Sequence, residues 1–286
     1  MPKLSTIPTI IIENILKEPF RREPEPDLIM DDPEQVLSFR DAGRHEGALD
    51  ALYIYHTSIA SKVIQGCKKV LDLGCGPGIP LIKMARLNPH IQFTGVDLSD
   101  PMLQLARDQV QTRGLKNIEF RKCDMTDLSE FKDHSFDGVT SLQAFHHLPT
   151  FGHLEQTFQE IQRVLKPEGA LYLQDLIRLK SRHSTIHFAY YDPEAPYLTQ
   201  LDGERSMRAA FSFDDYKLLR ETYLPLRSEL TKTAFAGIYF VLKTESHSLP
   251  KDVQDRIEAM RNSLRPNSKK YFKDIALFHR LGGLQC

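Results

Sequence analysis

The sequence predicts an α/β fold, with a parallel sheet and helices on both of its faces. Two observations carry this prediction. Short apolar runs of strand length alternate with helical patterns through the middle of the chain, from about residue 43 to residue 178. A glycine-rich stretch, VLDLGCGPGIP from Val70 to Pro80, links the first apolar run to the helix after it. A chain of 286 residues is long enough for one such core with additional segments.

The predicted elements follow one another in a regular order. A helix is expected over about residues 43–65, because apolar side chains recur there at helical spacing. Ser99 is a predicted N-cap for a later helix, with Pro101 near its first position. The predicted strands are 69–73, 91–98, 118–124, 136–143 and 169–176. The other helices between them are 80–87 and 153–165, and the latter stops at KPEG.

The two ends of the chain carry further predicted helices. Ile7, Ile11 and Ile15 form one stripe, which predicts a short amphipathic helix that docks on the body of the protein. The charged, proline-rich residues 17–34 are expected to form an extended arm. Near the other end, two more amphipathic helices are expected. One carries Val253, Ile257, Met260 and Leu264, and the other spans residues 269–281.

Composition limits the classes of function. Hydrophobic residues make up 41% and charged residues 26%, as in an ordinary globular protein. The formal charge of −1 gives no general attraction to nucleic acid. No apolar run reaches the ~18–20 residues of a membrane span, and a signal peptide is not expected. The four cysteines show no metal-ligand spacing and are expected to be reduced thiols in a cytoplasmic protein.

The glycine loop predicts a ligand that approaches bare backbone. Gly74, Gly76 and Gly78 follow a buried strand, so the loop lies at the carboxyl end of that strand, where ligands bind in such sheets. A dinucleotide site would need G-x-G-x-x-G, and Ile79 occupies the position of its third glycine. Asp72 is better suited to an ammonium group than to a phosphate. We therefore expect a nucleoside with a cationic amino-acid end.

Two further acids at strand ends agree with this expectation. Asp97 closes the second strand, 19 residues after Gly78, where one carboxylate can accept both hydroxyls of a ribose. Asp124 closes the third strand and is followed by Met125, so the pair could bind an adenine amino group and cover the ring. Each acid alone could instead be a helix cap. Together with the glycine loop, the three acids predict one nucleoside site.

Five motifs in order resemble the class I S-adenosylmethionine-dependent methyltransferases. They are VLDLGCGPGIP, GVDLS, CDMTDL, FDGVTSLQAFHHL and RVLKPEGALYLQDL, and the resemblance covers about residues 66–178. It is greatest to the small-molecule enzymes that include quinone-biosynthesis methyltransferases. Residues 211–245 are similar to the closing helix and final strand pair of that family. The resemblance implies a Rossmann-like sheet of seven strands, mostly parallel with an antiparallel last strand.

The same resemblance implies roles for individual residues. Asp72 would hold the methionine end of S-adenosylmethionine, with Gly74, Cys75, Gly76 and Gly78 in the surrounding loop. The remaining implied contacts are Asp97 to the ribose, Leu98 against the adenine, Asp124 and Met125 beside the base, and Gln143 at the methionine or the acceptor. No metal ligand is implied.

His146 and His147 are the candidate catalytic residues, because they follow the fourth strand where the methyl group would lie. If the nucleophile carries a proton, one imidazole could accept it. The other could brace the loop, and His146 is favoured for the chemistry because it is nearer the strand end. His183 and His187 are weaker candidates. The arginines of FRREPEP and RSMRAA are expected on solvated faces rather than at a phosphate.

Segments outside the motifs are expected to bind the acceptor. We expect residues 1–65 to form an arm and capping helices, residues 66–178 and 211–244 the cofactor-binding core, residues 179–210 a lid, and residues 245–286 a helical tail. Tyr53 on the capping helix is a candidate acceptor contact. Tyr190 and Tyr191 in the lid could stack on a planar acceptor or only pack the lid.

Several acceptors are disfavoured by missing motifs. SLQAFHH replaces the Asn/Asp-Pro-Pro-aromatic motif of amino-directed nucleic-acid enzymes, no cysteine follows a proline, and the paired glutamates of protein-arginine enzymes are absent. A small-molecule acceptor is therefore expected, for a monomer or homodimer. A peptide side chain as acceptor, or a non-catalytic subunit that only binds the cofactor, stays open. The attacking atom could be oxygen, nitrogen, carbon or sulfur.

Overall fold

A single seven-stranded sheet forms the centre of the computed structural model, which describes residues 6–26, 31–43, 47–192, 195–224 and 227–285. Its strand order is β3-β2-β1-β4-β5-β7-β6. The strands are β1 (Lys69–Leu73), β2 (Gln92–Asp97), β3 (Ile118–Lys122), β4 (Phe136–Leu142), β5 (Leu165–Leu176), β6 (Glu229–Lys232) and β7 (Tyr239–Lys243).

The strand directions confirm the predicted fold class. β1, β2, β3, β4 and β5 pair in parallel, whereas β7 runs antiparallel between β5 and β6. The order turns back at β1, with β2 on one side and β4 on the other. In open parallel sheets, this is the place where the carboxyl ends of the strands leave a crevice for a ligand.

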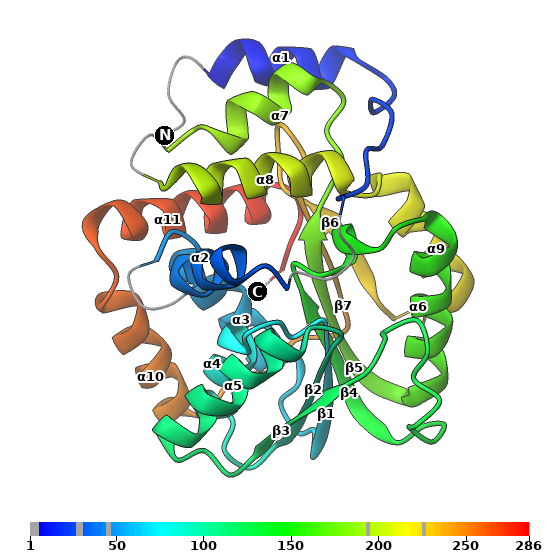
Figure 1. Ribbon diagram of the computed structural model, residues 1–286, viewed down its shortest axis with the longest axis vertical. Helices are drawn as coiled ribbons and strands as arrows, with labels where there is room; N and C mark the ends of the chain where they lie inside the picture. Colours follow the sequence, from blue (N-terminus) through cyan, green and yellow to red (C-terminus); the bar gives the residue numbers. More distant parts are fainter. Residues whose placement is uncertain (1–5, 27–30, 44–46, 193–194, 225–226, 286) are drawn as a thin grey trace.

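Helices cover both faces of the sheet (Figure 1). One face carries the layer of α3, α4 and α5, to which α10 and α11 are added, and the other face carries α6 and α9. The bounds in this layering are α3 (Asp50–Val63), α4 (Ile79–Leu87), α5 (Asp100–Arg113), α6 (Phe151–Val164), α9 (Phe213–Tyr223), α10 (Lys251–Asn262) and α11 (Pro266–Leu281).

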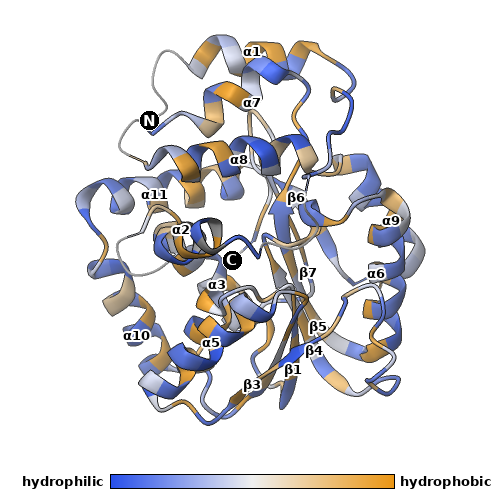
Figure 2. Ribbon diagram, in the orientation of Figure 1, coloured by the Kyte–Doolittle hydropathy of each residue, from blue (hydrophilic) through white to orange (hydrophobic). Residues whose placement is uncertain are grey.

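The core follows from the buried central strands. β1 and β4 have helices on both faces, so their side chains are buried in either direction, and Figure 2 shows apolar residues gathered along these strands. Ser99 caps α5 as predicted, because its side chain accepts a hydrogen bond from the Met102 amide at 3.3 Å. Capping at this position starts α5 directly after the end of β2.

Three predicted boundaries are wrong. Residues 33–43 form a helix, α2 (Pro33–Gly43), that the sequence analysis assigned partly to the extended arm. The helix expected over about 43–65 begins only at Asp50. The strand expected over 169–176 begins earlier, at Leu165, and includes KPEG, whereas the helix before it ends at Val164 and so stops before KPEG as predicted.

The predicted N-terminal helix exists, but it packs with the opposite face. α1 (Ile7–Ile15) buries Thr9 and Glu13, while Ile7, Ile11 and Ile15 are 48%, 51% and 72% exposed. The Glu13 carboxylate accepts hydrogen bonds from the backbone amides of Lys180 and Ser181. These bonds at the start of α7 place a charged residue inward, which hydrophobic periodicity cannot predict.

The predicted lid contains two helices, α7 (Arg182–Ala189) and α8 (Tyr197–Ala209). They lie with α1 at one end of the molecule, above the carboxyl ends of the parallel strands (Figure 1). The arm passes beside them, since the Glu23 amide donates to the Arg208 carbonyl at 3.1 Å. None of the helices within the described ranges is long and apolar enough to cross a membrane. Motion of the lid stays a prediction.

Candidate cofactor and acceptor site

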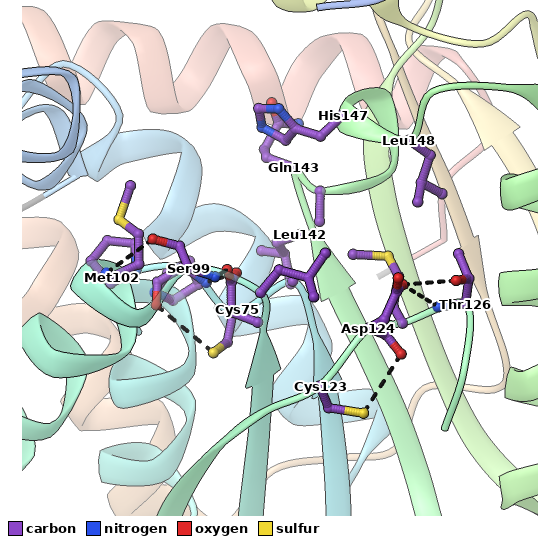
Figure 3. Close-up of a pocket in the computed structure, with 18 of the residues that line it drawn as sticks. Cys75, Ser99, Met102, Cys123, Asp124, Thr126, Leu142, Gln143, His147 and Leu148 are labelled. Atoms are coloured by element: carbon purple, nitrogen blue, oxygen red, sulfur yellow. Dashed lines mark hydrogen bonds between the residues drawn. The ribbon is translucent and has the colours of Figure 1, made fainter. Parts of the chain in front are cut away.

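A pocket opens at the carboxyl ends of β1, β2 and β4 (Figure 3). Its wall includes the glycine loop after β1, the acid at the end of β2 and the turn after β4. In Figure 3, Gln143 and His147 lie at one end of the pocket, and Asp124 and Thr126 lie away from them near the end of β3. The predicted residues that line it are Tyr53, Gly74, Cys75, Gly76, Asp97, Leu98, Asp124, Met125, Gln143 and His147.

The glycine loop has the backbone that its residues predict. Gly74 has φ +63°, and a Cβ there would lie 2.4 Å from the Ala144 Cβ, so only glycine fits. Gly78 has φ +74° and begins α4, but it does not line the pocket. The loop therefore turns tightly and presents the backbone of Gly74 and Gly76 to a ligand.

Asp97 holds the loop while facing the pocket. One carboxylate oxygen accepts the Gly76 amide at 2.8 Å, and the other accepts the Ser99 amide at 2.9 Å. Each oxygen has two acceptor sites, so both keep capacity for a hydroxyl of a ligand. Burial raises the pKa of Asp97, whereas the hydrogen bonds from the Ser99 and Gly76 amides lower it by a smaller amount. This geometry fits a ribose diol.

Asp72 does not line the pocket. Its side chain is buried below the loop, and Oδ1 accepts a hydrogen bond from the Thr140 hydroxyl at 2.6 Å. Burial raises the pKa of this carboxyl to about 7, with a smaller contribution from the charge of Asp97. Direct contact of Asp72 with a ligand ammonium group is therefore not supported, and an interaction through water stays a prediction.

Asp124 and Gln143 occupy two other edges of the pocket. Asp124 Oδ1 accepts from both the amide and the hydroxyl of Thr126 at 2.8 Å, which leaves Oδ2 for a ligand. Gln143 has φ +55°, a left-handed conformation that is uncommon for a residue with a side chain. Its side-chain amide donates to Gln174 Oε1 at 3.1 Å. The strained turn directs the chain after β4 over the pocket.

The two adjacent histidines have different environments. His147 lines the pocket, and its Nδ1 lies 2.7 Å from Glu25 Oε2. His146 is buried away from the pocket, and its Nδ1 donates to Asp175 Oδ1 at 2.6 Å. His147, and not His146, therefore lines the pocket, and which of the two histidines faces the methyl group stays a prediction. Both histidines belong to the short helix η2 (Phe145–His147), and the centroids of their two rings lie 4.2 Å apart.

Glu25 and His147 form an ion pair. Burial disfavours both charges, but the hydrogen bond and charge of the partner outweigh it, so the pKa of Glu25 falls to about 2 and that of His147 rises to about 9. A protonated imidazole donates hydrogen bonds and does not accept a proton. The general-base role of either histidine thus stays a prediction, without support from this arrangement at neutral pH.

The arm is held at this end of the pocket by Arg22. Its guanidinium donates to the carbonyls of Pro149 at 2.6 Å and Leu148 at 2.5 Å, and also to those of His146 and Ala209. The Arg22 guanidinium carbon lies 3.8 Å from the ring centroid of Phe211. Arg208, from RSMRAA, pairs with Glu23 and Glu204. The expectation that these arginines lie on solvated faces is wrong for Arg22 and Arg208.

Sequence reasoning missed Glu25, Asp175 and Asp202. Asp175 lies next to the last residue of β5. Like Asp72 in β1, it is a carboxylate within an otherwise apolar strand. The same signal could have found Asp175. Glu25 lies in the arm and Asp202 on α8, and no local pattern marks either one. The structure brings neither Tyr190 nor Tyr191 to the pocket.

The two lid tyrosines have other surroundings. The Tyr190 hydroxyl donates to Glu204 at 3.0 Å, within the lid. Tyr191 lines a separate apolar cavity among α1, α7, α8 and α11, together with Phe188 and Met207. Stacking of either ring on an acceptor in the pocket is therefore not supported.

This sheet order, with an antiparallel strand beside β5 and a glycine loop after β1, defines the Rossmann-like methyltransferase fold. A SAM-dependent methyltransferase of known structure from Aquifex aeolicus has the same fold, with a TM-score of 0.51 and 20% identity over 75% of this chain and 98% of that one. The plantazolicin methyltransferase BpumL in complex with SAH aligns with a TM-score of 0.55 and 16% identity, over 75% of this chain and 91% of that one.

Residues 70–169 match the sequence model of the family described as "Methyltransferase domain". A curated relative is the 27-O-demethylrifamycin SV methyltransferase of Amycolatopsis mediterranei, which is 33% identical over 114 residues, or 40% of each chain. The match spans well under two thirds of this relative.

Proposed function

We propose that this protein transfers a methyl group from S-adenosylmethionine to a small-molecule acceptor. The observation that carries the proposal is Asp97, which holds the glycine loop with one carboxylate oxygen and the start of α5 with the other, and still faces the pocket. Support also comes from the methyltransferase-domain match, from the fold of the Aquifex enzyme, and from the rifamycin and plantazolicin enzymes, whose acceptors are natural products.

The residues of the pocket divide the work of binding. Asp97 would accept the ribose hydroxyls, Asp124 Oδ2 would accept the amino group of the base, and the backbone of Gly74 and Gly76 would line the amino-acid end. The sulfonium methyl of the bound cofactor is already activated. The protein then has to align the acceptor with the carbon–sulfur bond and exclude water.

The acceptor would enter at the end of the pocket that holds Gln143 and His147. Tyr53 also lines the pocket and is 2% exposed, so its ring forms part of the wall. η2 and the residues after it line this end of the pocket, and Arg22 joins the arm to them. We infer that these segments select the acceptor, while the cofactor half is shared with relatives.

Asp97→Ala should weaken binding of S-adenosylmethionine by about 1–3 kcal/mol, because the ribose loses its acceptor and the Gly76 amide loses its partner. Isothermal titration calorimetry on both proteins measures the effect. Asp108→Ala is the matched control, since Asp108 is an exposed acid on α5. Equal affinity of the Asp97 variant and the wild type would refute the ribose assignment. Wild-type protein that ignores S-adenosylmethionine but binds NADH would refute the proposed function.

His147→Ala should lower kcat for the acceptor by about tenfold to a hundredfold, because misplacement of a bound reactant by about 1 Å can cost that much. Cofactor affinity should stay within about twofold, since the cofactor contacts lie at the other residues of the pocket. The acceptor comes from a metabolite panel incubated with methyl-labelled cofactor and read by mass spectrometry. His90→Ala, an exposed histidine before β2, is the control. Full activity of His147→Ala would remove that side chain from the reaction.

A further inference from the structure

We propose that Glu25, His146 and His147 form a binding site for a divalent transition-metal ion at the acceptor end of the pocket. One ligand atom of each residue lies within 4.8 Å of the others. Two imidazoles and one carboxylate are a donor set that suits zinc and other first-row metals, and they leave further coordination positions open. The site is assembled from two distant segments, the arm and η2.

Asp175 gives His146 the environment of a metal ligand. A carboxylate can only accept, so the contact of 2.6 Å fixes the proton of His146 on Nδ1 and leaves Nε2 as the free donor atom. The second oxygen of Asp175 accepts the His146 backbone amide at 3.0 Å, which fixes the turn. A carboxylate behind a histidine in this way is the usual support of a metal-bound imidazole.

Asp202 adds a second carboxylate from the lid. It is partly buried and interacts electrostatically with Glu25, His146 and His147. No hydrogen bond or ion pair of Asp202 is found within the part of the chain that the structure describes. Asp175 and Asp202 are thus two further carboxylates beside the three candidate ligands, one behind His146 and one on the lid.

The open positions of such an ion would face the pocket, because His147 lines it. There the ion could bind and polarise an oxygen of the acceptor beside the methyl group. This role rests on the proposed function, whereas the metal site itself does not. A bound ion in this role would limit the acceptors to molecules that carry an oxygen ligand close to the methylated atom.

Metal binding can be tested without any acceptor. The purified full-length chain is stripped with a chelator and titrated with Zn²⁺, and bound metal is counted after dialysis by mass spectrometry. Co²⁺ then serves as the spectroscopic probe, since its visible absorption reports the coordination number. We expect one ion per chain, and Glu25→Gln and His147→Ala should each weaken binding at least about tenfold.

Two further variants sharpen the result. Asp175→Asn should weaken binding by about tenfold to a hundredfold while retaining the shape of the residue. His183→Ala, an exposed histidine on α7, should bind as the wild type does. The isosteric Glu25→Gln keeps the test valid if an alanine variant does not fold, as circular dichroism would show.

Two outcomes would overturn the proposal. Wild-type chain that retains no Zn²⁺ or Co²⁺ would mean that Glu25 and His147 form an ion pair only. Stoichiometric binding that survives in the Glu25→Gln, His147→Ala double variant would place the metal elsewhere. Calorimetry of S-adenosylmethionine on the same samples separates the metal site from the proposed function. Binding of the cofactor to metal-free protein supports the proposed function, whereas the metal site is decided by the metal-binding data alone.

Discussion

Arg22→Met should lower the free energy of unfolding by about 3 kcal/mol, because hydrogen bonds from a charged group to buried carbonyls contribute strongly and the carbonyls lose their donor. Arg22 is half-buried, and burial lowers its pKa to about 10. The cost of burying this charge offsets part of the free energy of its hydrogen bonds, so the expected loss of stability is smaller than the sum of the separate bond contributions. Urea unfolding followed by circular dichroism measures the change. Hydrogen exchange should also increase over residues 17–26, since Arg22 fastens the arm to the turn after β4.

Arg21→Met provides the matched control for this experiment. Arg21 precedes Arg22 in the same arm and is exposed, so its loss should change stability by less than about 0.5 kcal/mol. Equal effects of the two substitutions would show that general charge, and not the contacts of Arg22, stabilises the arm.

Acidification should destabilise the protein through two histidines in the core. His279 on α11 is fully buried, and neither of its ring nitrogens has a hydrogen-bond partner among the described residues. Burial lowers its pKa from 6.5 to about 4, and it also lowers the pKa of His56. The unfolded chain therefore binds more protons than the folded one in this range, so stability falls as the pH drops from about 6.5 to about 4. His279 alone accounts for about 3 kcal/mol.

The groups that face His279 do not offset a positive charge. They are the aromatic rings of Tyr55 and His56 on α3 and of Tyr239 on β7, and none of these side chains is an acid that could pair with a charged imidazole at this pH. His56 Nδ1 shares a hydrogen bond of 2.7 Å with the Tyr172 hydroxyl. Since no carboxylate is among these neighbours, protonation of either histidine leaves an unpaired charge in the core.

His279→Phe tests this account. The aromatic ring keeps the packing and removes the titration, so the variant should lose less stability than the wild type between pH 7 and pH 4.5. Chemical unfolding at a series of pH values gives the comparison. His90→Phe removes an exposed histidine and should leave the pH dependence unchanged. If the slope of stability against pH is the same in His279→Phe and the wild type, other groups control the acid response.

The proposed cofactor half of the pocket could be predicted from the sequence because its residues lie in short motifs at strand ends. The glycine loop, Asp97, Asp124 and Gln143 each follow a strand, and a parallel sheet brings such ends together. Asp72 shows the limit of this reasoning, since its place in the motif does not reveal that Thr140 holds it below the loop.

The acceptor half could not be predicted in the same way. Glu25 and Asp202 reach His147 from segments 122 and 55 residues away in the sequence, by subtraction of their numbers. Tertiary contacts alone decide that proximity. The inverted packing of α1 has the same origin, because Glu13 is buried by its bonds to the start of α7 rather than by its own hydrophobicity.

The division of the pocket has a consequence for how such a protein can diversify. The residues that we propose to contact the nucleoside lie at the strand ends of the sheet, whereas Glu25 and Asp202, which interact with His147 at the acceptor end, come from the arm and the lid. Substitutions, insertions or exchanges in the arm and the lid can change the choice of acceptor without altering the strands that hold the cofactor. The two halves can therefore evolve, or be engineered, as separable modules that meet only at the turn carrying His146 and His147.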